Sequence, residues 1–76
     1  MADSIETIIR ERIASGELPR VELLTMKVWP GTGAPCDGCG QTIHLGHVQV
    51  ELRFRGDQVV RFHFSCCRIW MGETSN

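Results

Sequence analysis

The chain has 76 residues, which is enough for one small domain. It is 42% hydrophobic and 22% charged, and its formal net charge of −1 counts against avid non-specific binding to nucleic acid. No apolar run approaches the roughly eighteen residues of a membrane span, and the N-terminus lacks the basic and apolar segments of a signal peptide. We therefore expect a soluble protein of the reducing cytoplasm that has no membrane partner.

The first predicted element is an amphipathic helix within residues 1–20. Four isoleucines recur at the spacing of one helical face: Ile5, Ile8, Ile9 and Ile13. Asp3 is placed to cap the helix together with Glu6, and Gly16 is placed to end it. The apolar stripe either packs against the rest of the chain or docks a protein partner or a second copy of this chain, and both interpretations stay open.

A strand and a loop follow in residues 21–35. Residues 21–29 alternate as a strand does, with Leu24, Met26 and Val28 on one side of it. The segment from Pro30 to Pro35 is rich in glycine and proline and is predicted to end the strand. It lacks the Lys-Ser/Thr pair of a phosphate-binding loop, so we expect no nucleotide there.

Residues 36–72 are predicted to form a knuckle, a hairpin and a short helix. The segments 48–54 and 59–64 alternate apolar and polar residues on either side of a turn at Gly56, which is typical of a hairpin with one apolar face. A helix is predicted from Ser65, as its N-cap, to Gly72. Two of its residues are expected to pack against the hairpin: Ile69 and Trp70.

Two pairs of soft metal ligands carry the strongest functional signal in the sequence. Each pair is separated by two residues: Cys36 and Cys39, then His63 and Cys66. Thiolate and imidazole groups at this spacing are what a tetrahedral structural zinc ion takes. A structural zinc contributes about 10–16 kcal/mol in small finger peptides, which would stabilise a chain with so small a core. The sequence therefore predicts one structural Zn²⁺; two disulfides are the alternative reading of the four cysteines.

Three other residues compete for a place in this site. Cys67 is the rival of Cys66, which we prefer because its spacing from His63 straddles the corner between strand and helix. We expect Cys67 to be a small buried residue. His44 and His47 lie close to the first cysteine pair, and we expect both on the surface. The alternative for His44 is a residue that supports the ligands or is itself a minor ligand.

The segment 34–71 resembles the zinc finger of poly(ADP-ribose) polymerases. The likeness rests on the Cys36–Cys39 pair, a hairpin, and the run Phe62-His63-Phe64-Ser65-Cys66 followed by Trp70, although the insert is shorter here. The resemblance implies a treble-clef finger whose zinc ligands are Cys36, Cys39, His63 and Cys66. That family binds damaged DNA ends with basic residues, for which the candidates here are Arg53, Arg55, Arg61 and Arg68. Acidic residues balance them in this segment: Asp37, Glu51, Asp57 and Glu73.

We therefore expect residues 1–76 to be a single zinc-binding domain of the small α+β class. It would be a treble-clef finger extended by an N-terminal amphipathic helix and a strand. We expect a non-enzymatic module that binds a protein or a nucleic acid, with no catalytic residues and no small-molecule substrate. The alternative is a thiol-redox or metal-handling protein that uses the pair Cys36 and Cys39.

Overall fold

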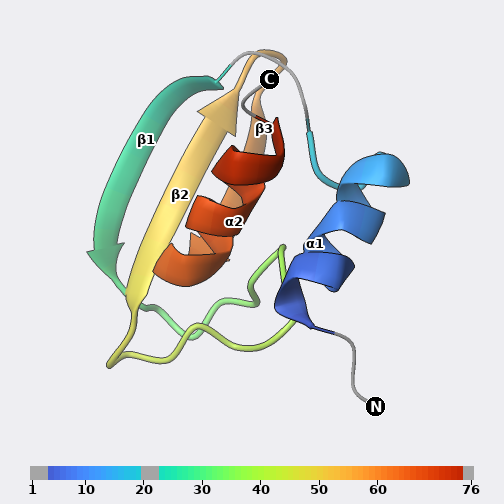
Figure 1. The fold of residues 1–76 in the computed structure, drawn as a ribbon. Coiled ribbons are helices and arrows are strands. Elements are labelled where there is room, and N and C mark those ends of the chain that lie inside the picture. Colours follow the sequence, from blue (N-terminus) through green and yellow to red (C-terminus); the bar gives the residue numbers. More distant parts are fainter. Residues whose placement is uncertain (1–3, 20–22, 75–76) are drawn as a thin grey trace.

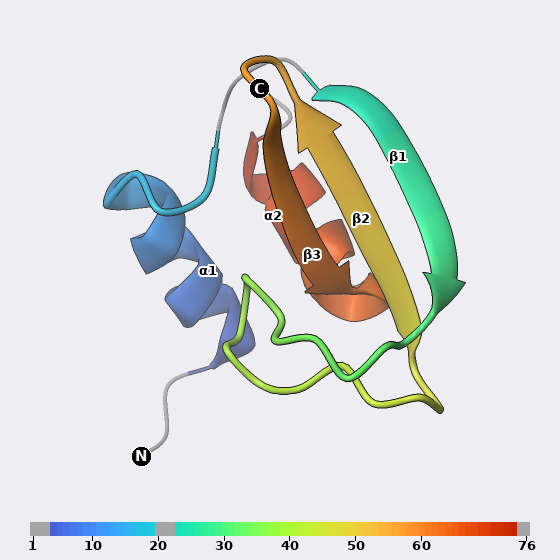
Figure 2. The same cartoon turned by 180° about the vertical axis from the view of Figure 1, so that it is seen from behind.

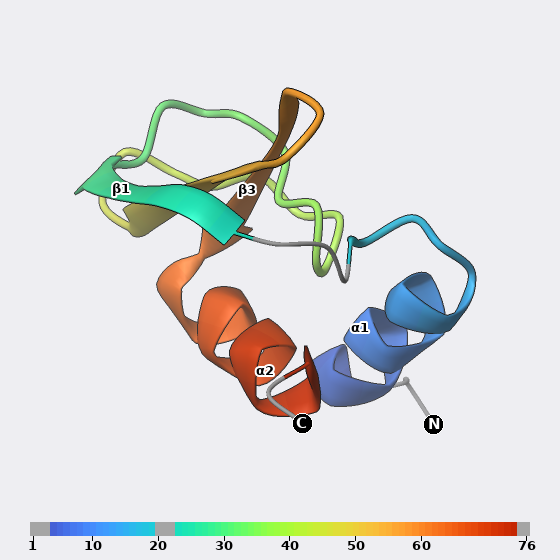
Figure 3. The ribbon, with the colours of Figure 1, turned by 90° about the horizontal axis from the view of Figure 1, so that it is seen from above.

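The computed structural model of the protein describes residues 4–19 and 23–74, which form two helices and a three-stranded antiparallel sheet (Figure 1). The elements follow in the order α1 (Ile5–Ala14), β1 (Leu23–Pro30), β2 (Val48–Phe54), β3 (Gln58–His63) and α2 (Phe64–Thr74). The sheet forms one layer, and both helices lie side by side on the same side of it (Figure 3). The predicted small α+β class is therefore confirmed.

Helix α1 is capped by Ser4. The backbone N–H of Thr7 donates to Ser4 Oγ at 3.1 Å, so the N-cap is Ser4 rather than the predicted Asp3, which lies outside the described residues. Beyond the last helical residue, Gly16 adopts a φ of 87°, as expected of a glycine that ends a helix.

The centre of the α1 apolar stripe is used inside the chain. The side chains of Ile9 and Ile13 are 0% and 5% exposed, and α1 packs against α2. Ile5 at the first turn is 44% exposed. Two of the four isoleucines of the stripe, Ile9 and Ile13, therefore belong to the core.

Strand β1 is an edge strand of the sheet. It pairs with β2 alone, and a bulge at Leu24 interrupts the register between Leu23 and Thr25. The strand continues through Pro30, which pairs with Val48. The segment from Pro30 to Pro35 therefore ends the strand as predicted, with Pro30 itself as the last strand residue, because an edge position tolerates a residue without a backbone N–H.

Strands β2 and β3 form the predicted hairpin, and its apolar face carries the core. Gly56 and Asp57 adopt φ values of 91° and 64° at the turn. The indole N–H of Trp70 donates to the Pro19 carbonyl at 3.2 Å, and its ring lies 5.5 Å from that of Phe54. Trp70 therefore ties α2 to the sheet and to the segment after α1. The core is completed by Ile9, Ile13, Leu18, Ile43, Val50, Leu52, Val60 and Phe62.

Helix α2 follows β3 without an intervening loop. It begins at Phe64, so the predicted strand ends one residue early, and Ser65 lies inside the first turn instead of acting as the N-cap. Helix α2 also passes the predicted end at Gly72 and continues to Thr74, whose hydroxyl donates to the Trp70 carbonyl at 2.8 Å. Neither described helix is long and apolar enough to cross a bilayer; α2, the longer, has 11 residues.

Candidate metal centre

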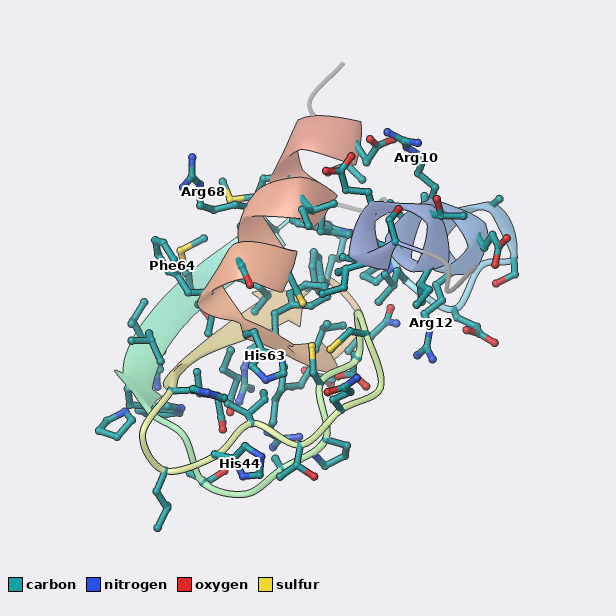
Figure 4. All side chains as sticks on the ribbon, turned by 60° about the horizontal axis from the view of Figure 1, so that its bottom comes forward. Arg10, Arg12, His44, His63, Phe64 and Arg68 are labelled. Carbon is teal, nitrogen blue, oxygen red and sulfur yellow. The ribbon has the colours of Figure 1, made fainter. Side chains whose placement is uncertain are left out.

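Three separate parts of the chain meet at one cluster of metal-ligating side chains. Two cysteines lie in the loop between β1 and β2, the histidine ends β3, and the third cysteine lies in the first turn of α2: Cys36, Cys39, His63 and Cys66. Their ligand atoms all lie within 4.8 Å of one another. The Nδ1 atom of His63 is 3.5 Å from Cys39 Sγ and 3.9 Å from Cys66 Sγ (Figure 4). The four residues lie close enough to bind one metal ion.

The loop that carries Cys36 and Cys39 folds back on itself as a tight knuckle. The N–H of Cys36 donates to the Gln41 carbonyl at 2.8 Å, and the N–H of Gly40 donates to the Cys36 carbonyl at 2.9 Å. Gly40 has a φ of 82°, a conformation that glycine adopts without strain. This backbone arrangement turns both cysteine side chains to one side of the loop. Figure 2 shows how the loop runs beneath the sheet toward the end of β3.

Backbone donors surround the sulfur of Cys36. The N–H groups of Gly38 and His63 both lie 3.4 Å from Cys36 Sγ. A hydrogen bond from the Cys66 thiol is the main cause that lowers the pKa of Cys36 to about 4, and the backbone donors add to it against the effect of burial. The same contact, with burial, raises the pKa of Cys66. The site is therefore already suited to hold at least one thiolate.

The ring of His63 is oriented by a backbone carbonyl. Its Nε2 atom lies 3.2 Å from the Thr42 carbonyl oxygen, which can only accept a hydrogen bond. With the proton on Nε2, the lone pair of Nδ1 faces the sulfur atoms. A carbonyl partner of this kind is typical of metal-binding histidines, because it selects the tautomer and the ring orientation.

The rival ligands lie outside the cluster. Cys67 is buried at 3% exposure, burial raises its pKa, and it is absent from the one metal-ligating group found among the described residues. His44 and His47 are exposed, and the His47 ring lies 5.4 Å from the rings of both His44 and His63. His47 therefore packs beside the cluster without joining it.

Two supporting contacts were not predicted from the sequence. The buried Gln49 accepts hydrogen bonds at Oε1 from the N–H and the hydroxyl of Thr32, at 3.1 and 2.9 Å. Arg12 on α1 donates to the Asp37 carbonyl at 3.1 Å. The strand pattern places Gln49 on the polar side of β2 but does not show that the loop covers it, and no local motif links Arg12 to the knuckle.

The structure does not gather the four predicted basic residues on one surface. Arg53 and Arg61 lie on the sheet face opposite α2, since their neighbours along the strands are buried beneath that helix. Arg61 is paired with Glu51 at 3.4 Å. Arg68 projects from α2, on the other side of the sheet, while Arg55 lies beside the hairpin turn.

Three sulfurs and one imidazole nitrogen match, in number and kind, the donors that a tetrahedral structural zinc ion takes. The oriented histidine and the backbone N–H groups aimed at sulfur agree with that use. No family model, no curated protein and no solved structure matches this chain. The resemblance to poly(ADP-ribose) polymerase fingers therefore stays a prediction that rests on the motif, and the metal centre rests on its own geometry.

Proposed function

We propose that this chain is a non-enzymatic zinc-finger module that serves macromolecular interaction, with a protein as the favoured partner. One observation carries the proposal: three cysteines and a histidine from distant parts of the chain bring their ligand atoms within 4.8 Å of one another. Zinc at this point would join the knuckle, the end of β3 and the start of α2. That connectivity fits a treble-clef finger.

A structural role for zinc follows from the size of the core. A chain of 76 residues buries a small apolar core, and domains of this size commonly need a metal or disulfides for stability. The four cysteines are free thiols, as a reducing compartment such as the cytoplasm would keep them. Bound zinc would add stability by linking the knuckle, the end of β3 and the start of α2 through one ion.

The closed donor set supports a binding role over catalysis. Catalytic zinc sites keep one coordination position for water or substrate, whereas four protein ligands fill a tetrahedral ion. In redox proteins a helix follows the Cys-x2-Cys motif. Here a loop follows the pair Cys36 and Cys39. We therefore assign no reaction to the site.

A protein partner fits the surface better than a nucleic acid. The net charge is −1, the guanidinium of Arg61 is already paired with Glu51, and Arg68 lies across the sheet from Arg53. Several large apolar side chains are exposed on β1 and α2. Exposed apolar groups that gather on one face are typical of protein-binding surfaces.

Substitution by Co²⁺ tests the coordination directly. A tetrahedral site with three thiolates should give strong visible ligand-field bands and sulfur-to-cobalt charge-transfer absorption at one equivalent of Co²⁺. One equivalent of Zn²⁺ should then abolish both signals. Absorption typical of six oxygen and nitrogen ligands, or no absorption at all, would refute the proposed centre.

A further inference from the structure

Helix α2 leaves one strand of the sheet uncovered. It packs against β2 and β3, but no Cα atom of α2 lies within 8 Å of one in β1. Within the described residues β1 also has no neighbour on its outer side. The outward N–H and C=O groups of alternate residues along β1 therefore have no strand partner among the described residues.

Apolar side chains on the α2 side of β1 are exposed as a result. Met26 and Val28 pair with Leu52 and Val50, which are buried beneath α2, so all four point to the same face. Met26 is 44% and Val28 56% exposed. Val48 is exposed on the same face of β2, and Phe64 and Met71 are exposed on α2. These five residues are called the β1 strip: Met26, Val28, Val48, Phe64 and Met71.

Helix α2 contributes Phe64 and Met71 to the β1 strip. Phe64, Arg68 and Met71 follow one another at helical spacing, and Figure 4 shows Phe64 and Arg68 on the side of α2 that faces β1. Two hollows adjoin α2 and share Ser65. One of 390 Å³ is lined by His47, Val48, His63, Phe64 and Ser65, and one of 330 Å³ by Ser65, Arg68 and Ile69.

The positive charge of Arg68 borders the β1 strip (Figure 4). Arg68 forms no ion pair or hydrogen bond with any described residue. Two carboxylates on α2 and β2 that could pair with Arg68 are already paired with other arginines. Glu73 of α2 contacts Arg10, and Glu51 of β2 contacts Arg61 on the opposite face of the sheet. A ligand on the β1 strip would therefore gain from a carboxylate placed at Arg68.

We propose that β1 and the β1 strip bind an extended segment of a partner protein, which adds to the sheet as a fourth strand. Its backbone would pair with the free edge of β1, its alternate apolar side chains would cover Met26 and Val28, and an aspartate or glutamate would reach Arg68. A second copy of this chain paired through β1 fits less well, because the described residues of β1 (Leu23–Pro30) carry no carboxylate and the copy would bring another Arg68. The inference rests on the proposed function, since bound zinc would fix the start of α2, which carries Phe64 and Arg68, at the end of β3.

Selection from a displayed library of random decapeptides against the zinc-loaded full chain tests this inference. We expect peptides with apolar residues at alternate positions and one acidic residue. The charge reversal Arg68→Glu should select lysine or arginine at that position, whereas Arg53→Glu, on the opposite face, should leave the selected pattern unchanged. No enrichment, or a pattern that Arg68→Glu does not alter, would overturn the inference.

The selected consensus peptide, once synthesised, tests the strand addition. Val28→Asp should weaken its binding by about tenfold or more, and the matched change Thr25→Asp, on the opposite face of β1, should not. Amide hydrogen exchange of β1 should slow on binding. Equal effects of both variants, unchanged exchange in β1, or a dimer in sedimentation equilibrium would each contradict the proposal.

Zinc content and the dispersion of the amide spectrum, measured on each variant, distinguish a failure of the docking site from a failure of the proposed zinc-finger function. A folded, zinc-loaded chain that binds no peptide refutes the docking site alone. A chain that binds no zinc refutes the proposed function, and with it the docking site that depends on it.

Discussion

The backbone N–H of His63 lies 3.4 Å from the sulfur of Cys36, so the residue that offers an imidazole to the metal also donates a hydrogen bond to another ligand. The same backbone position ends β3 and leads directly into α2, which carries Cys66. Hydrogen bonds to a ligand sulfur stabilise its thiolate form. The two ligand pairs are therefore linked through the backbone, and a bound ion would link them a second time.

Cys66 and Cys67 offer a matched pair of substitutions. Cys66→Ala should abolish stoichiometric zinc binding and unfold the finger, because three ligands remain and α2 loses its link to the knuckle. Cys67→Ala should retain one zinc and cost about 1 kcal/mol, as expected for a small buried side chain. Zinc content and urea unfolding measure both results. Full zinc occupancy and a folded spectrum in Cys66→Ala would overturn the ligand assignment.

Gly31 is expected to be intolerant of any side chain. A Cβ atom at this position would overlap the carbonyl group of His44, where the loop ends pass close to each other. Gly31→Ala should therefore lower the free energy of unfolding by about 1–3 kcal/mol, since the backbone must move. Gly46→Ala is the control, because its Cβ would meet nothing within 4 Å. Equal stability of the two variants in chemical denaturation would show that the close approach is absent in solution.

Gln49 should hold the loop before the knuckle to the sheet. Gln49→Leu removes the acceptor of both Thr32 hydrogen bonds and should destabilise the chain by about 1–3 kcal/mol. The Thr32 amide should exchange faster with solvent in that variant. Gln58→Leu, at an exposed position of β3, should change neither quantity. An unaltered exchange rate at Thr32 would disprove the role of Gln49.

Nucleic acid should bind only weakly. With the Arg61 guanidinium paired and Arg68 on the other side of the sheet, we expect a dissociation constant for short duplex or single-stranded DNA no tighter than about 10⁻⁴ M at physiological salt. Fluorescence anisotropy over a salt series measures this. A dissociation constant below about 1 μM that weakens steeply with salt would favour the DNA-binding role over the protein-binding one.

The parts of the fold that short-range spacing determines could be predicted from the sequence. Alternation located the hairpin, and the two-residue spacing of Cys36 and Cys39, and of His63 and Cys66, indicated which side chains meet. Boundaries depended on tertiary context. Pro30 stays in β1 because the edge of the sheet tolerates it, and Phe64 enters α2 because the helix starts directly at the end of β3.

Contacts between distant segments could not be predicted. Gln49 reads as a solvent-facing residue of β2, yet the loop that bears Thr32 covers it. Arg12 contacts the knuckle only because α1 packs beside α2. The exposure of the apolar face of β1 could not be predicted either. The alternation of apolar and polar residues shows which residues share a face, but it does not show that α2 fails to cover them.

Native mass spectrometry of the purified chain, with circular dichroism before and after chelation, tests the central claim most directly. The account predicts one zinc ion per chain, four reduced cysteines, and loss of the folded spectrum when the metal is removed. Re-addition of one equivalent of Zn²⁺ should restore the spectrum. A metal-free chain whose mass indicates disulfides, or a fold that survives complete chelation unchanged, would contradict it.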